Sequence, residues 1–152
     1  MFKHLAVCTA FLFVVCTPPP QATEGDEMTS DVIDINMSKA DIYNKTLQWI
    51  ASAFVSSKHV IELKDRSQGV IVGNGITYVT WQLLSFEMHF TIRIDIKDQK
   101  YRFSSFNYVA YYDHVASNGM SKELANRTQE KINLLERSLN SYLAESMNAN
   151  NF

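Results

Sequence analysis

The sequence predicts an α+β fold, in which a single antiparallel sheet of about five strands carries two helices on one face. Residues 85–97 alternate between apolar and polar side chains, which is the period of a strand with one buried face. Residues 39–54 and 121–147 instead repeat their apolar side chains at helical spacing. The expected element order is β-α-β-β-β-β-α, which leaves the second face of the sheet polar and open.

Composition supports one globular domain. The chain has 152 residues, of which 46% are hydrophobic and 20% are charged. Its 14 basic and 16 acidic residues leave a formal net charge of −2. A mildly acidic chain lacks the basic surface that neutralises phosphates, so we expect no nucleic-acid partner.

The N-terminal region has the features of a targeting segment. Lys3 precedes an apolar run at residues 5–15, which is too short to span a bilayer comfortably as a helix. The three prolines follow, among small and acidic residues, and this composition is typical of a disordered tether. The expected boundaries are a signal peptide at 1–16, a Pro-rich tether at 17–30, a folded domain at 31–147 and a tail at 148–152.

Cys16 stands where the apolar run stops, and three interpretations of it are open. In the first, Cys16 is the acylated residue of a bacterial lipoprotein, although Val15 stands where a small residue is usual. In the second, the chain is secreted after cleavage behind Ala22, and in the third the apolar run is an uncleaved anchor. All three predict export to the cell envelope or beyond it. If Cys16 is modified, the membrane is a partner through the lipid anchor.

The folded domain contains no cysteine, because the only other one is Cys8 in the targeting segment. A disulfide, a zinc site built on cysteines and a cysteine nucleophile are therefore excluded within the domain. We expect neither a metal nor a cofactor.

The first strand and first helix follow from local signals. Residues 31–37 alternate, and this pattern predicts a short strand whose inward side chains are Ile33, Ile35 and Met37. Ser38 and Asp41 then form an aspartate version of a capping box, which predicts a helix start. Trp49 lies on the apolar stripe of that helix, so we expect a core residue rather than a platform for a ligand.

A β-hairpin is expected next. Residues 60–65 and 69–79 have the period of strands, and the turn between them ends at Gly69, which can adopt a positive φ. Gly73 and Gly75 are expected to serve a bulge or bend. A phosphate loop is not expected, because no third glycine and no helix follow them.

The remaining elements are two strands and a closing helix. After the strand 85–97, the turn 98–100 leads to a strand whose aromatic residues are expected half in the core and half in cross-strand pairs, namely Tyr101, Phe103, Phe106, Tyr108, Tyr111 and Tyr112. A less ordered stretch at 113–120 precedes the helix 121–147. Its predicted apolar stripe comprises Leu124, Thr128, Ile132, Leu135, Leu139, Tyr142, Leu143 and Met147.

The candidate binding face is the polar side of the strand 85–97, where Glu87, His89, Thr91 and Arg93 lie in one row. With tyrosines and phenylalanines nearby, this face is expected to contact another envelope protein or a small ligand without catalysis. The alternative is a hydrolase that uses Glu87 and His89 as an acid–base pair. That alternative predicts a concave pocket and a perturbed carboxylate, whereas a flat solvated surface argues against it.

Several of these segments resemble one known family. It is the bacterial envelope domain described as a domain of unknown function with a TATA-box-binding-protein-like fold. The resemblance covers about residues 31–145 and rests on IYNKTLQWIASAF, VIELKDRSQGVIVGNG, FTIRIDIKDQKYRFSSFNY and the closing helix. It implies a single repeat of that fold in a secreted or lipid-anchored protein, and it implies no catalytic residues. The fold name does not imply DNA binding, because a fold does not determine a function.

Overall fold

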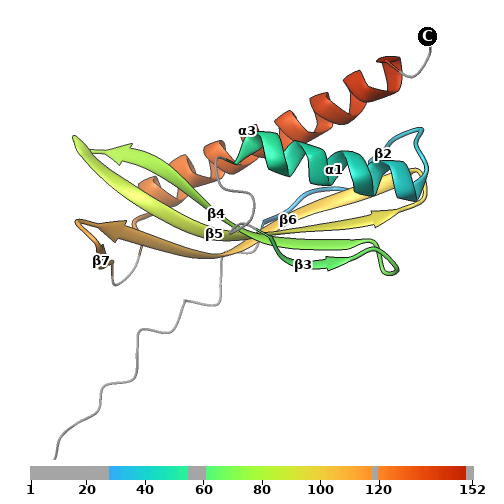
Figure 1. Ribbon diagram of the computed structural model, residues 1–152. Coiled ribbons are helices and arrows are strands. Elements are labelled where there is room, and N and C mark those ends of the chain that lie inside the picture. The colour runs from blue at the N-terminus through green and yellow to red at the C-terminus, as the bar shows by residue number, and fades with distance from the viewer. Residues whose placement is uncertain (1–27, 55–60, 118–119, 150–152) are drawn as a thin grey trace, which may run out of the picture.

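The computed structural model of the protein describes residues 28–54, 61–117 and 120–149. It forms one antiparallel sheet with both helices on the same face (Figure 1). The strands are β1 (Met28–Thr29), β2 (Ile33–Asp34), β3 (Ile61–Asp65), β4 (Val70–Trp81), β5 (Leu84–Lys97), β6 (Lys100–Tyr112) and β7 (Val115–Ala116), and the helices are α1 (Lys39–Ala53) and α3 (Lys122–Ala149). The main strand order is β1-β6-β5-β4-β3, and β2 and β7 also pair with β6. The predicted α+β class is confirmed.

Two short strands add to the predicted set, and both pair with β6. β1 falls at the end of the segment predicted as a tether, and its two residues pair with Ser105 and Ser104. The sheet therefore begins before residue 31, while the rest of the predicted tether and the signal peptide lie outside the described residues. β7 follows a tight turn at Asp113 and His114, which both have positive φ. A two-residue strand is too short to show a period, so the alternation pattern cannot reveal it.

The start of α1 confirms the predicted capping box. The Ser38 hydroxyl accepts a hydrogen bond from the Asp41 backbone N–H at 3.2 Å and donates one to the Asp41 carboxylate at 2.6 Å. This exchange satisfies a backbone donor that the first helical turn leaves unpaired. Trp49 is 2% exposed in the core, as predicted, and its indole N–H donates to the Ser138 hydroxyl of α3 at 3.2 Å.

The core fills the space between the sheet and the two helices. β5 supplies its centre with Phe90, Ile92, Ile94 and Ile96, and α3 covers it with Ile132, Leu139 and Leu143. α3 begins after Ser121, whose hydroxyl accepts from the Leu124 N–H, and it runs two residues past the predicted end at Met147. Neither described helix is long and apolar enough to cross a membrane. Because both helices pack on the same face of the sheet, the other face is uncovered (Figure 1).

The two glycines within β4 have different roles. Gly75 pairs directly with Phe90 of β5, and a Cβ at Gly75 would lie 2.4 Å from the tip of the Phe90 ring. Gly73 pairs with Ile61 at the point where the register of β3 shifts. The predicted bulge is thus found in β3, opposite Gly73, and Gly75 provides the space that the core ring of Phe90 occupies.

Replacing Gly75 with alanine should lower the free energy of unfolding by about 1–3 kcal/mol, because the new methyl group forces the buried Phe90 ring to move. Urea denaturation followed by circular dichroism measures this change. The matched control is the double variant Gly75→Ala, Phe90→Leu, in which a smaller side chain faces the methyl group. Its loss should be smaller than the sum of the two single losses, and simple additivity would contradict the assigned contact.

A second bulge changes which residues of β6 face away from the helices. Asn107 has a φ of 56°, and the pairing between β5 and β6 shifts register between His89 and Thr91. Tyr101 and Phe103 precede this bulge and lie in the core, as predicted for half of the run. Beyond it, Tyr111 pairs with Glu87 and so lies on the face away from the helices. The bulge therefore brings an aromatic side chain to the uncovered face.

Candidate functional site

The candidate site is the sheet face that the helices leave uncovered, which we call the open face. Figure 1 shows both helices on the opposite side of the sheet. Directly paired residues share a face of an antiparallel sheet. The register therefore defines three rows across β4, β5 and β6, namely Tyr78–Glu87–Tyr111, Ile76–His89–Val109 and Asn74–Thr91–Phe106. Along the predicted row on β5, Glu87, His89, Thr91 and Arg93 do share this face, and their neighbours are largely apolar or aromatic.

Glu87 and His89 are in direct contact on the open face. His89 Nε2 lies 2.6 Å from Glu87 Oε1, and the Tyr78 hydroxyl donates to Glu87 Oε2 at 3.3 Å. The His89 ring packs on Tyr111 with a centroid separation of 4.6 Å. Two tyrosines from the neighbouring strands thus flank a carboxylate–imidazole pair.

The electrostatics of this pair do not favour the hydrolase interpretation. The hydrogen bond from His89 lowers the pKa of Glu87, and the hydrogen bond from Tyr78 adds to this effect. A carboxyl with a lowered pKa is ionised near neutral pH and is a weaker base, so it is poorly suited to general acid or general base catalysis. Both side chains are partly exposed on a sheet surface. The pair therefore has the properties of a surface contact.

Thr91 is more buried than we expect of a residue that contacts a partner. It is 9% exposed, and its hydroxyl donates to Asn74 Oδ1 at 3.0 Å. Asn74 in turn donates through Nδ2 to the Glu62 carboxylate on β3. Thr91 therefore supports the open face by positioning Asn74.

Arg93 is held by a neighbouring carboxylate on the same strand. Its Nε and one terminal nitrogen donate to Asp95 at 3.0 and 2.8 Å, and Arg102 of β6 approaches the same carboxylate at 3.9 Å. These contacts offset the positive charge of Arg93 at this end of the row. Arg93 therefore meets the open face as part of an ion pair.

Two exposed side chains on β4 belong to the site and are absent from the predicted row. Ile76 is 53% exposed and Tyr78 is 62% exposed, and they pair with His89 and Glu87. The signal for them lies in the alternation of β4, because Ile71 and Val79 are buried and the even-numbered positions face away. The glycines between these residues interrupt the pattern, which is why the sequence alone does not assign a face to Ile76.

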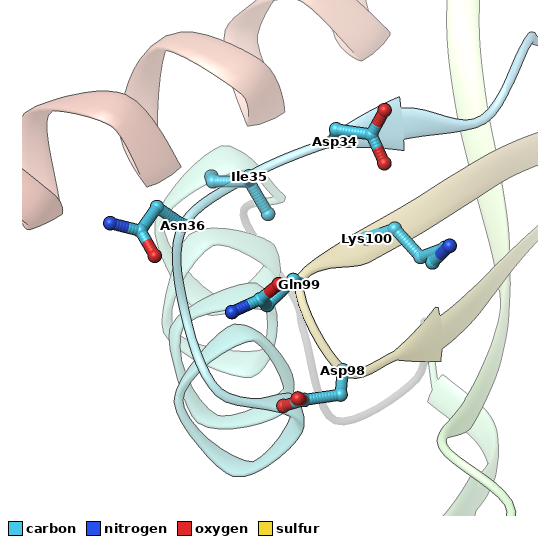
Figure 2. Close-up of a pocket in the computed structure, with 6 residues that line it drawn as sticks. All are labelled: Asp34, Ile35, Asn36, Asp98, Gln99 and Lys100. Atoms are coloured by element: carbon cyan, nitrogen blue, oxygen red, sulfur yellow. The ribbon is translucent and has the colours of Figure 1, made fainter.

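A shallow pocket of about 500 Å³ lies beside the C-terminal end of β5, at the turn that leads to β6. It is lined by Asp34, Ile35, Asn36, Asp98, Gln99 and Lys100 (Figure 2). The Ile35 N–H donates to the Gln99 carbonyl and the Gln99 N–H donates to the Met37 carbonyl, so backbone bonds close the loop around it. Figure 2 shows Asp34 and Asp98 on separate segments, where their carboxylates do not converge. The pocket offers no acid–base pair, and Glu87 and His89 do not line it.

Replacing His89 with valine should raise the pKa of Glu87 towards its ordinary value, because the main hydrogen bond that lowers it is removed. A pH titration of the carboxyl carbons by NMR measures the change, and Arg93→Val serves as a control outside the hydrogen bonds of Glu87. In the native chain, the pKa of Glu87 is lower in the folded state than in the unfolded state. The pair thus contributes stability above the unfolded pKa, and this contribution is lost as the pH falls through the folded value. A Glu87 titration that is the same in both variants contradicts this assignment.

One antiparallel sheet with both helices on a single face places the protein in the class of TBP-like folds. The chain belongs to the family described as "Domain of unknown function (DUF4468) with TBP-like fold", whose model matches residues 29–109.

Two solved structures are similar to this chain in fold. A DUF4468 family protein from Bacteroides ovatus ATCC 8483 has a TM-score of 0.62 at 14% identity, over 77% of this chain and 85% of that one. A TBP-like protein from Parabacteroides distasonis ATCC 8503 has a TM-score of 0.64 at 14% identity, over 78% of this chain and 92% of that one. At such identities the likeness shows the fold alone. A comparison with curated proteins gave no match.

Proposed function

We propose that this chain is a non-catalytic protein of the bacterial cell envelope, which binds another protein through the open face of its sheet. The observation that carries the proposal is the pair of exposed apolar side chains, Ile76 and Tyr78, beside the partly exposed Glu87 and His89. An aromatic residue at the centre of a contact, surrounded by polar groups, is the arrangement that contributes most to protein–protein affinity.

The open face favours a protein over a small ligand, because none of its site residues lines the pocket described above. Small molecules bind in concave sites that bury most of their surface. The paired rows of β4, β5 and β6 instead present Ile76 and Tyr78 on β4 and Tyr111 on β6, on the two sides of β5. Such a surface suits a partner with a wide contact surface, such as another protein. A small ligand is the second candidate.

The same proposal includes export and a lipid anchor at Cys16. Its support is the apolar run that ends at Cys16 and the proline-bearing segment behind it. Metabolic labelling with a fatty acid tests this part. Label should enter the native chain and be absent from Cys16→Ala, and label retained by Cys16→Ala would remove Cys16 as the acceptor.

Capture from envelope extracts tests the open face. The double variant Ile76→Ser, Tyr78→Ser should lose at least tenfold of the partner that the native chain retains, because it removes the exposed apolar centre of the contact. Leu134→Ser is the matched control, since Leu134 is also an exposed hydrophobic residue, 54% accessible, but lies on α3.

Thermal unfolding of each variant separates binding from folding. The melting temperatures should stay close to that of the native chain, because the substituted side chains are exposed. Equal capture by the native chain and the double variant would overturn the proposal for the open face.

A further inference from the structure

The turn between β4 and β5 carries an apolar side chain at its apex. This turn, which we call the hairpin tip, comprises Trp81, Gln82, Leu83 and Leu84. Leu83 is 98% exposed, so it makes almost no contact with the rest of the chain. Figure 1 shows the tip projecting at one end of the sheet, and β7 lies at that same end.

The backbone of the tip makes leucine an unfavourable choice for folding. Gln82 and Leu83 have φ values of 48° and 67°, in the left-handed region. Tight hairpin turns of this kind favour asparagine and glycine, because other side chains are strained there. Leu83 therefore adds strain and exposes apolar surface, and no packing contact compensates for either. Neither the turn nor the core accounts for it.

Behind the apex, the tip has an aromatic base. The Trp81 ring lies 6.2 Å from the Phe86 ring, and the Phe86 ring lies 5.6 Å from that of Tyr112 on β6. Tyr112 and Leu84 remain exposed. An apolar apex beside a partly buried Trp and an exposed Tyr is the arrangement that protein segments adopt at the boundary between lipid and water.

Charge is absent from β4 and from the first three residues of β5. Residues 70–86 contain no Asp, Glu, Lys or Arg, and the first charged residue after the tip is Glu87. Burying a charge in hydrocarbon is expensive, so an uncharged hairpin tip meets a basic requirement for insertion. The neighbouring turn before β7 carries Asp113 and His114 and does not meet it.

We propose that the hairpin tip inserts Leu83 into the outer layer of a lipid bilayer and so orients the domain on the membrane. The inference rests on the proposed location in the cell envelope. A single leucine is a weak membrane anchor, and stable attachment needs a second signal, which the lipid at Cys16 would supply. The tip would then fix the orientation of a domain that the anchor holds nearby.

The length of chain outside the described residues permits this contact. Met28 pairs with Ser105, which pairs with Ile92 of β5. The nine positions from Ile92 to Leu83 span about 30 Å along the strand. The twelve positions from Cys16 to Met28 can span at most about 40 Å when extended. The segment is therefore long enough for a lipid on Cys16 and the hairpin tip to reach the same membrane surface.

Quenching of tryptophan emission by brominated lipid tests the insertion. The probe is the full chain with residues 11–16 replaced by six histidines, bound to phosphatidylcholine vesicles that contain a nickel-chelating lipid. This attachment replaces the lipid on Cys16 and keeps the length of the tether. Trp49 is buried in the core and gives a constant background, so a change in emission reports Trp81 beside the apex.

Brominated acyl chains should reduce the emission of the chain with the native tip, relative to unbrominated vesicles. Leu83→Asn should lose this reduction, and Leu134→Asn, which changes an exposed leucine on α3, should retain it. Asparagine tolerates a positive φ, so Leu83→Asn should unfold at the same temperature as the native chain or a higher one. Loss of quenching then cannot result from unfolding.

Equal emission from the native tip in brominated and unbrominated vesicles would overturn the inference, and so would quenching that Leu83→Asn leaves unchanged. Specific capture of a protein by Leu83 in place of quenching would instead identify the tip as a protein contact. Because the attachment is imposed, the result does not depend on acylation of Cys16 or on binding by the open face. Failure of the proposed function is therefore distinguishable from failure of this inference.

Discussion

Replacing Trp49 with alanine should lower the free energy of unfolding by about 3–5 kcal/mol, which is a large part of the stability of a domain of this size. The indole is 2% exposed, and its ring meets that of Phe54 edge-on at 6.1 Å. Truncation to a methyl group leaves a cavity between α1 and α3. Urea denaturation followed by circular dichroism measures the loss.

Trp49→Phe is the matched control for this prediction. It keeps most of the ring in place and removes the hydrogen bond to Ser138, so the loss should be clearly smaller than that of Trp49→Ala. A loss below about 1 kcal/mol for Trp49→Ala would mean that Trp49 is not packed as the structure places it.

Replacing Gly69 with valine should cost about 3 kcal/mol or more, because two separate penalties combine. Gly69 has a φ of 72°, which is strained for a β-branched residue. In addition, a Cβ at this position would lie 2.2 Å from the Ile96 carbonyl oxygen and 2.6 Å from the Lys39 side chain. The backbone carbonyl is fixed by pairing in the sheet, so the turn itself has to distort.

Gln68→Val provides the control for Gly69→Val. Gln68 lies next to Gly69 in the same turn, and its side chain is exposed. Its backbone N–H donates a hydrogen bond to the Asp65 carboxylate at 2.9 Å. Valine preserves that bond, so the change should be within about 0.5 kcal/mol. Similar losses of stability at both positions would contradict this prediction, because they would mean that the turn tolerates no valine, whatever the φ of the residue replaced.

Alternation and helical spacing were sufficient to predict the main elements. β5 extends over residues 84–97 against a prediction of 85–97, and the turn glycine Gly69 has the positive φ expected of it. These features depend on local physics, namely the period of buried side chains and the conformational freedom of glycine. Local patterns therefore predicted the layers of the fold and the face on which Glu87 lies.

The features that escaped prediction depend on contacts between distant segments. β1 exists because β6 provides a partner, and the placement of Tyr111 on the open face depends on the bulge at Asn107. The exposure of Ile76 follows from its pairing with His89 in the register. From the sequence alone, Leu83 is an ordinary apolar residue. Its positive φ and its exposure are evident only in the folded turn.

Cross-linking in intact cells can detect the proposed contact between the open face of the sheet and a protein of the cell envelope. A photoreactive phenylalanine analogue at position 78 tests it most directly in intact cells, with the same analogue at the exposed Lys131 of α3 as control. We expect a discrete cross-linked protein from position 78 that is absent from position 131. Identical cross-linking patterns from the two positions would contradict it.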